Sequence, residues 1–307
     1  MSDDTSAAAK VKSPKEKPPS HSFRVSTDDV RQGFRRRRMT ELAEQIERRR
    51  AVADALGSEA AVHMPREDGF ALVPSGAFEF APVVRAARDV VTRADLAAKR
   101  EKSNKAFMVK VADKDDLTLA SPLLQLGLDR RLVAVAARYL GMLPILEYAN
   151  VFYSSHAGDE LAKSQLFHCD SDEVEQVKLF VLCEDVTPAH GPLTFLSASD
   201  SQRVRDHVGY RFNTRLTDEQ VRDALGGEVR EQALLGPAGA AGLIDTSRCL
   251  HYGSRFADAS ARRVVVMLQY VTPLAFLYAS DHRMSARFRH LAAPDSDEMT
   301  SLVLGRL

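Results

Sequence analysis

The sequence predicts an α+β protein, in which an antiparallel β architecture such as a jelly roll is buttressed by helices from the N-terminal part of the chain. Two observations support this fold class. Helical periodicity dominates the first half of the chain and strand-like runs dominate the second, without the regular alternation of βαβ units. Of the 307 residues, 45% are hydrophobic and 27% are charged, which suits a well-buried core inside a water-soluble surface.

The N-terminal segment differs in composition from the rest. Residues 1–25 are rich in Lys, Ser, Pro, Asp and Ala, so we expect a disordered tail before a single domain over residues 26–307. The tail lacks the apolar core of a secretory signal, and no apolar run is long enough to predict a membrane span. The three cysteines do not suggest a disulfide framework. A cytoplasmic location is the simplest expectation, and the oligomeric state stays open.

A long amphipathic helix is expected directly after the tail. Ser26 or Thr27 can cap it, Gly57 can end it, and apolar residues recur between them mostly at three- and four-residue steps. Other helical patterns cover residues 78–97, 129–141 and, as an insert between strands, about 217–226.

Six short runs predict strands, because they are rich in β-branched and aromatic residues and are bounded by Gly, Pro, Asp or Ser. They cover residues 143–153, 165–170, 177–186, 192–197, 241–246 and 263–271. The sequence contains no GxxxxGK[ST] phosphate loop, and no GxGxxG fingerprint follows a strand. The two common glycine-rich nucleotide-binding motifs are therefore absent.

The most informative motif is His168-Cys169-Asp170. On a strand, His168 and Asp170 point to the same face while Cys169 points away, so two metal donors share one side. His251 is well placed in the sequence to supply a third. Two histidines and one carboxylate form the facial triad of non-haem iron(II) oxygenases, which leaves positions open for a cosubstrate and dioxygen. An isolated HxD motif is weak evidence, because nine histidines and 42 acidic residues produce such pairs by chance.

The surroundings of this motif are more specific. The segment QLFHCDSDEVEQVKLFVLCEDVTPAHGPLTFLSAS, residues 165–199, resembles the metal-binding core of the phytanoyl-CoA dioxygenase family. The distal element also matches that family: His251 is followed by Gly253-Ser254 and, eleven residues after the histidine, by Arg262. The resemblance covers about residues 143–275. It implies a double-stranded β-helix, the jelly-roll fold also called cupin-like.

The resemblance also implies the cofactors. Iron(II) would be held by His168, Asp170 and His251, and 2-oxoglutarate would chelate the same iron as cosubstrate. The implied reaction is that of a dioxygenase, which uses O2 to hydroxylate or desaturate a small-molecule substrate and converts 2-oxoglutarate to succinate and CO2. The presence of Asp170 disfavours halogenation. No catalytic residue beyond the metal ligands is implied.

An arginine is expected to bind the distal carboxylate of 2-oxoglutarate, because its planar guanidinium matches a carboxylate. The family spacing favours Arg262 over Arg263, which would face the opposite side of the same strand. Tyr153, Lys178 and Ser254 are further candidates for binding cosubstrate or substrate, although they could equally fill barrel positions. Three segments could form the mouth of the site: residues 154–164, 201–230 and 272–290.

A zinc or thiolate site is one alternative. It would use Cys169, Cys183 and Cys249, but no CxxC pair is present and Cys169 would face away from His168. A jelly-roll binding protein without turnover is another, although the intact triad argues against it.

The third alternative is polyanion or nucleic-acid binding through the arginines at 35–38 and 48–50. Glu41, Glu44 and Glu47 are interleaved with these arginines, which favours pairing within a solvated or intramolecular face. Lys+Arg and Asp+Glu both total 42, so net charge gives no reason to expect a nucleic-acid partner.

Overall fold

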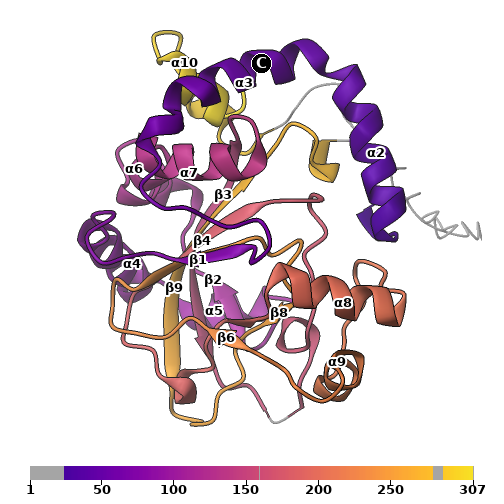
Figure 1. Ribbon diagram of the computed structural model, residues 1–307. Coiled ribbons are helices and arrows are strands. Elements are labelled where there is room, and N and C mark those ends of the chain that lie inside the picture. The colour runs from indigo at the N-terminus through magenta and orange to yellow at the C-terminus, as the bar shows by residue number, and fades with distance from the viewer. Residues whose placement is uncertain (1–23, 159, 279–285, 307) are drawn as a thin grey trace, which may run out of the picture.

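Two antiparallel β-sheets lie at the centre of the computed structural model, which describes residues 24–158, 160–278 and 286–306 (Figure 1). Of the predicted disordered tail, residues 1–23 lie outside the described residues. The larger sheet has the order β1-β7-β4-β9-β3-β2, and the smaller has the order β6-β5-β8. This mixture of helices and antiparallel sheets agrees with the predicted α+β class.

The strands of the larger sheet are β1 (Phe70–Leu72), β2 (Met108–Lys110), β3 (Ile145–Ser155), β4 (Val177–Leu182), β7 (Ala241–Ile244) and β9 (Arg262–Val271). Those of the smaller sheet are β5 (Thr194–Phe195), β6 (Gln232–Ala233) and β8 (His251–Tyr252). Five of the six predicted strands therefore correspond to observed ones, within a few residues at their ends. The prediction of a strand at 165–170 was wrong, because Phe167 and His168 make only isolated bridges, to Leu216 and His251.

Strand β9 runs between β3 and β4 and gives the larger sheet two different faces. Side chains alternate along a strand, so neighbouring residues of β9 belong to opposite faces. On one face Val264, Val266, Leu268 and Tyr270 join the main hydrophobic core. On the other face Arg263, Val265, Met267 and Gln269 line a cavity.

Helices cover the hydrophobic face. α4 (Ala81–Arg93), α6 (Pro122–Gly127) and α7 (Arg130–Leu140) contact strands of the larger sheet and bury their apolar residues against it. The Asp129 side chain caps α7 by accepting from the Arg131 N–H, and Gly141 ends the helix with φ 75°, a conformation that suits glycine. α4 and α7 are the helices predicted at 78–97 and 129–141.

The long N-terminal helix is present but is divided in two. α2 (Asp28–Glu41) and α3 (Ala43–Leu56) are separated by Leu42, whose φ of −111° and ψ of 23° are not helical. In Figure 1 they form an indigo arc over the top and right of the molecule. Thr27 and Gly57 are their outer caps, which agrees with the predicted limits.

Arg49 of α3 ties this arc to the remainder of the fold. Its side chain is only 1% exposed, and its guanidinium donates to the carbonyls of Leu143, Pro144, Leu302 and Arg306. The first two lie just before β3, and Leu302 lies in α10 (Glu298–Val303), near the C-terminal end. One buried cation therefore joins three parts of the chain, and burial lowers the pKa of Arg49 to about 10.

The remaining helices lie around the smaller sheet and the cavity: α5 (Leu96–Glu101), α8 (Ala198–Val208) and α9 (Asp218–Leu225). α9 corresponds to the predicted insert at 217–226. α8 was missed, although Ser197 is an N-cap whose side chain accepts from the Asp200 N–H. That serine belongs to a run that the sequence interpretation assigned to a strand.

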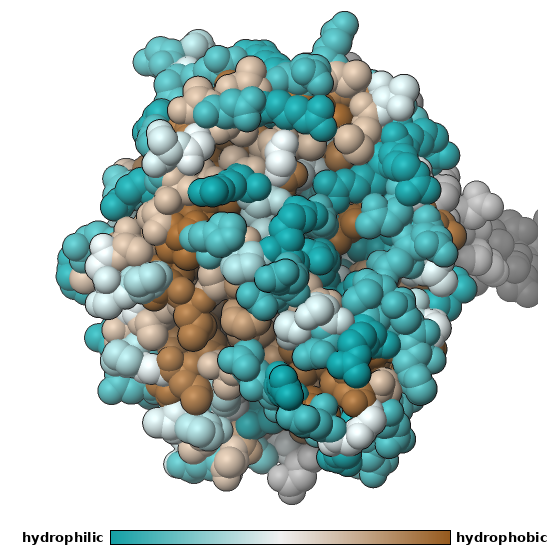
Figure 2. Space-filling model, viewed as in Figure 1, coloured by the Kyte–Doolittle hydropathy of each residue, from teal (hydrophilic) through white to brown (hydrophobic). Residues whose placement is uncertain are grey.

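The outer surface carries few large exposed hydrophobic residues, among them Leu72 and Leu235. Figure 2 shows a largely hydrophilic face on which hydrophobic residues gather mainly left of the centre. Among the described residues, no helix is both long and apolar enough to span a membrane.

Candidate metal centre

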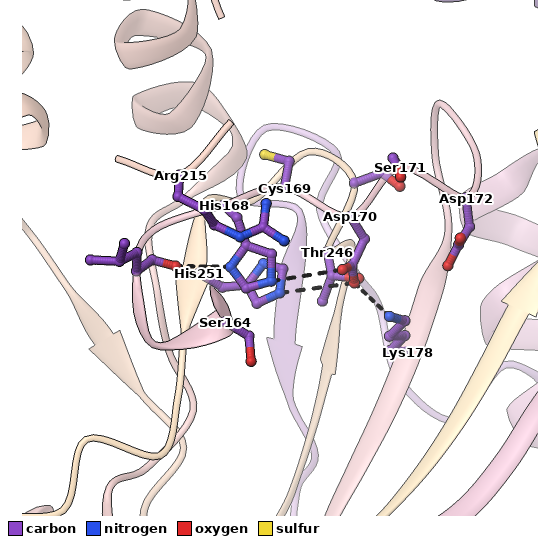
Figure 3. A network of polar contacts seen from close by, with 12 residues as sticks. Ser164, His168, Cys169, Asp170, Ser171, Asp172, Lys178, Arg215, Thr246 and His251 are labelled. Carbon is purple, nitrogen blue, oxygen red and sulfur yellow. Dashed lines mark hydrogen bonds and ion pairs between the residues drawn. The ribbon is translucent and has the colours of Figure 1, made fainter. Parts of the chain in front are cut away.

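Main-chain hydrogen bonds bring His168 and His251 together. Each residue donates its N–H to the carbonyl of the other at 3.0 Å, which makes an antiparallel bridge between two distant segments. The two imidazole rings have centroids 4.2 Å apart and an interplanar angle of 43°. Figure 3 shows both rings facing the same space beside Asp170.

A second set of contacts orients the two rings. Nδ1 of His168 lies 2.9 Å from the Leu166 carbonyl, and Nδ1 of His251 lies 3.0 Å from the Cys249 carbonyl. Because a carbonyl only accepts, each Nδ1 carries the hydrogen and each Nε2 is left with a free lone pair. Burial lowers the pKa of both histidines, that of His168 well below its ordinary value. Both are therefore neutral near pH 7, the form that binds metals.

Asp170 completes the group. Its Oδ1 lies 3.9 Å from Nε2 of His168, and its Oδ2 lies 3.9 Å from Nε2 of His251. These separations are too long for hydrogen bonds but shorter than twice a metal–ligand bond of about 2.1 Å. Among the described residues, this is the only group of three or more His, Cys, Asp or Glu whose ligand atoms meet, all within 4.8 Å of one another. The structure thus brings together the three residues proposed from the sequence.

Lys178 holds the Asp170 carboxylate from the other side. Its Nζ lies 2.5 Å from Oδ2 of Asp170, as the dashed line in Figure 3 marks. Burial would raise the pKa of Asp170, but Lys178 and the two histidines outweigh burial and hold that pKa well below its usual range. The carboxylate is therefore ionised, and Lys178 contacts a candidate metal ligand rather than lying free in the cavity.

Buried Asp245 shapes the turn that leads to His251, and sequence reasoning missed it. Its carboxylate accepts from the main-chain N–H groups of Ser247 at 3.0 Å and Arg248 at 3.2 Å, and from the Tyr139 hydroxyl at 2.9 Å. Burial raises the pKa of Asp245 to about 7. An aspartate directly after a strand was the available signal, but its partner Tyr139 is distant in sequence.

A chain of amides continues from this turn to the cavity. Gln269 donates to Gln176 at 2.6 Å, and Gln176 donates to the Thr246 hydroxyl at 2.8 Å. The Thr246 carbonyl in turn accepts from the Asp170 N–H at 2.7 Å. The orientation of Asp170 therefore depends on β9, through residues that have no recognisable motif.

The three candidate ligands line a cavity of about 980 Å³ between the two sheets. The larger sheet contributes Lys178, Phe180 and Leu182 of β4 and the cavity face of β9. The smaller sheet and its flanks contribute Leu193, Leu234 and Tyr252. A cavity of this size suits a small-molecule ligand.

The two arginines at the start of β9 do not lie where the family spacing predicted. Arg262 is 64% exposed in its side chain, lies 3.4 Å from Glu184, and does not line the cavity. Arg263 is 7% exposed, lines the cavity, and donates to the Gly191 carbonyl and, at 3.2 Å, to the Ser254 hydroxyl. The geometry contradicts the choice of Arg262, because alternation along β9 turns Arg262 outward.

The other candidates for binding cosubstrate or substrate also differ in whether they face the cavity. Ser254 lines the cavity and has φ 63°, whereas Tyr153 lies on the opposite face of β3 and packs against the main core. Of the three segments expected at the mouth, two contribute lining residues, including Ser164 and Arg287, and residues 201–230 contribute none. The segment 99–110, which was not expected there, contributes several.

The cysteines do not join the candidate metal centre. The sulfur of Cys169 points away from the histidines in Figure 3 and accepts from Arg205 at 3.6 Å. Cys183 and Cys249 are buried in other hydrophobic clusters. The alternative zinc or thiolate site therefore has no support among the described residues.

Arginines of α2 and α3 form ion pairs with acidic residues of the same chain. Arg35 pairs with Glu175 at 2.9 Å, Arg38 with Glu41 at 3.2 Å, and Arg50 with Glu47 at 3.2 Å. With Arg49 buried, this pattern agrees with the expected intramolecular face. It leaves little free positive charge for a polyanion.

A scan against family models gives no match, and neither does a search of curated proteins. Among solved structures, the chain is similar to EctD from S. alaskensis in its apoform, with 19% identity, a TM-score of 0.48, and coverage of 69% of this chain and 78% of that chain. SnoN, a non-heme alpha ketoglutarate dependent epimerase from nogalamycin biosynthesis, has 17% identity, a TM-score of 0.45, and coverage of 72% and 83%. HygX from Streptomyces hygroscopicus, with nickel and 2-oxoglutarate bound, has 16% identity, a TM-score of 0.43, and coverage of 67% and 83%. At these identities, the function of the chain is inferred from its own residues.

Proposed function

We propose that the protein is a non-haem iron(II)- and 2-oxoglutarate-dependent oxygenase, built as one domain over about residues 26–307 around a double-stranded β-helix core. The observation that carries the proposal is the group of His168, Asp170 and His251 on the wall of the cavity, with both Nε2 atoms free. Two imidazoles, one carboxylate and open positions are the donor set of this oxygenase class. The resemblance of residues 143–275 to the phytanoyl-CoA dioxygenase family supports the same function.

The donor set fits an iron(II) ion. His168 and His251 are neutral, Asp170 is ionised, and each imidazole is oriented through Nδ1 by a carbonyl. When bound, iron(II) with 2-oxoglutarate and O2 supplies an oxidant that hydroxylates or desaturates a small molecule, while 2-oxoglutarate is converted to succinate and CO2. The protein contributes orientation, because Lys178 holds Asp170 and the amide chain links it to β9. The apolar cavity wall, including Phe180 and Val265, limits the access of water.

Arg263, rather than Arg262, is the proposed partner of the distal carboxylate of 2-oxoglutarate. Its guanidinium is buried against the cavity without a carboxylate partner among the described residues, and its Nε has no hydrogen-bond acceptor there. Burial lowers the pKa of Arg263 to about 10. A buried cation of this kind is stabilised when an anion binds beside it. The Gly191 carbonyl and the Ser254 hydroxyl hold the guanidinium in place.

The test is an anaerobic titration of the protein with iron(II) and 2-oxoglutarate, followed through the weak visible charge-transfer band of the ternary complex. The parent should form the band and His168→Ala should not. Arg263→Gln should need about 10- to 100-fold more 2-oxoglutarate, because it loses charge-assisted hydrogen bonds. Arg262→Gln is the matched control and should behave like the parent. The proposal fails if calorimetry shows that the parent does not bind 2-oxoglutarate in the presence of iron(II).

A further inference from the structure

Positive charge gathers along one side of the cavity, where basic side chains outnumber acidic ones. We call Lys102, Lys105, Lys110 and Arg287 the basic arc. All four line the cavity, and none makes an ion pair with a carboxylate of the described residues. They come from the segment between α5 and β2, from the end of β2, and from the C-terminal region. Elsewhere, as on α2 and α3, charged side chains are mostly paired.

The acids that line the cavity are already engaged. Asp170 binds Lys178, Asp172 binds Arg24, and Glu147 accepts from the Tyr278 hydroxyl at 2.5 Å. Glu147 also interacts electrostatically with Arg287. Burial raises the pKa of Glu147, while Tyr278 and Arg287 lower it. The cavity therefore keeps a positive excess beside the basic arc.

Two members of the arc lie against the same aromatic ring despite their like charge. Lys110 Nζ and the guanidinium carbon of Arg287 each lie 4.9 Å from the centre of the Tyr148 ring. Burial and then the charge of Arg287 lower the pKa of Lys110. The aromatic face offsets part of this repulsion. An anion bound between Lys110 and Arg287 would offset the rest of the repulsion between them.

Tyr148 gives a second, independent indication of a ligand. It lines the cavity, is only 8% exposed, and its buried hydroxyl has no hydrogen-bond partner among the described residues. Buried hydroxyls are nearly always hydrogen-bonded, so an exception in a cavity wall points to a group that binds there. The Tyr148 ring also stacks on Phe152 with centroids 6.1 Å apart, which provides an apolar surface next to the cations.

Lys105 connects this region with the candidate metal centre. Its Nζ donates to the Ser164 hydroxyl at 2.9 Å. Burial lowers the pKa of Lys105 to about 8, and the groups whose charges act on it include both Asp170 and Lys110. The cations thus extend from the neighbourhood of the three ligands to Tyr148, along a single cavity.

We propose that the primary substrate carries an anionic group, a carboxylate or a phosphate, which binds between Lys110 and Arg287 and accepts a hydrogen bond from the Tyr148 hydroxyl. The carbon part of the substrate extends past Phe152 and Met267 toward His168, Asp170 and His251. This inference rests on the proposed function and adds the substrate class to it. The anion fixes one end of the substrate, so that the C–H bond to be oxidised lies at the metal centre.

The experiment uses three probes of matched shape: phenyl phosphate, phenylacetate and neutral benzyl alcohol. Their binding to the iron(II)-loaded protein at saturating 2-oxoglutarate is measured by anaerobic calorimetry, which keeps Arg263 occupied. At least one anionic probe should bind about tenfold or more tightly than benzyl alcohol, and the better of the two identifies carboxylate or phosphate. Lys110→Gln and Arg287→Gln should each weaken that probe by roughly fivefold or more, without changing the affinity for 2-oxoglutarate.

Two variants serve as controls. Lys110→Arg keeps the charge and should retain most of the binding, which separates loss of charge from misfolding. Lys114→Gln removes an exposed lysine outside the cavity and should leave all probes unaffected.

A lack of preference for anions, including no detectable binding of any probe, overturns the inference, as does equal weakening by Lys110→Gln and Lys114→Gln. If the parent forms no iron and 2-oxoglutarate complex, the proposed function fails instead. The same probes on the metal-free protein then decide whether the basic arc binds anions.

Discussion

The two faces of the larger sheet use the same strands for different purposes. The face toward the helices carries Val264, Val266 and Leu268 of β9, all buried in the main core. The face toward the smaller sheet carries Arg263, Gln269 and other polar groups. Because neighbouring residues alternate, each strand can stabilise the fold on one side and hold a site on the other. Substitutions of adjacent residues on one strand should therefore differ in effect: one should mainly lower stability and the other should mainly change the site.

Two aspartates show the same contrast electrostatically. Asp170, on the cavity side, has its pKa held low, since Lys178 and the histidines outweigh burial. Asp245, packed with Tyr139 on the core side, has its pKa raised to about 7, mainly by burial and also by Glu175. The Asp170 carboxylate is kept ionised, the form in which it can bind a metal ion. The other serves as a structural acceptor.

The largest effect is expected at the candidate metal centre. Asp170→Asn keeps the size of the side chain and a hydrogen bond to Lys178 but removes the charged ligand. Iron(II) affinity should fall by more than about 100-fold, since even residues that only support metal ligands are worth about 10- to 100-fold. Iron(II) titration and assays of succinate formation measure this. Asp258→Asn, which changes an exposed acid, should match the parent, and full activity in Asp170→Asn would contradict the assignment.

The comparison of faces is tested directly by two neighbours on β9. Leu268→Ala should lower the free energy of unfolding by about 2–5 kcal/mol, because Leu268 is completely buried in the core. Met267→Ala should cost less than about 1.5 kcal/mol, because Met267 is only partly buried and faces the cavity. Urea unfolding measures both. Equal losses would show that the cavity face is packed as tightly as the core.

A smaller effect concerns pH. Between the ordinary Asp pKa of 3.8 and about 7, folded Asp245 keeps a proton that the unfolded chain has released. The free energy of unfolding should therefore fall as pH rises through this window, by up to about 1.4 kcal/mol per pH unit. Asp245→Asn cannot titrate and should have a flatter profile. Urea unfolding at pH 5, 6 and 7 compares the two, and parallel profiles would contradict the raised pKa.

The grouping of the three candidate metal ligands could be predicted from the sequence because its signal is local. The HxD motif and its spacing to His251 need no knowledge of which strands pair. Alternation also placed Cys169 correctly, away from the histidines, although residues 165–170 form only isolated bridges. The helix boundaries at Thr27, Gly57 and Gly141 followed from capping chemistry in the same local way.

Other features could not be predicted, because they depend on long-range pairing. Whether Arg262 or Arg263 faces the cavity depends on the register of β9 against β3 and β4. The basic arc joins residues near 102–110 with Arg287, which have no common motif. Asp245 becomes significant only when Tyr139 packs beside it.

Arg49 has a consequence for where this protein can be cut. The β-rich region at about 143–275 holds all three candidate metal ligands. The carbonyls of Leu143 and Pro144 at its edge nevertheless accept from Arg49 in a helix that precedes it by more than eighty residues. The same guanidinium also donates to the carbonyls of Leu302 and Arg306 near the C-terminal end. A fragment trimmed to the β-rich region would lose the cation that these carbonyls share. We expect such a fragment to be insoluble, so that shortened versions of the protein must keep both α3 and α10.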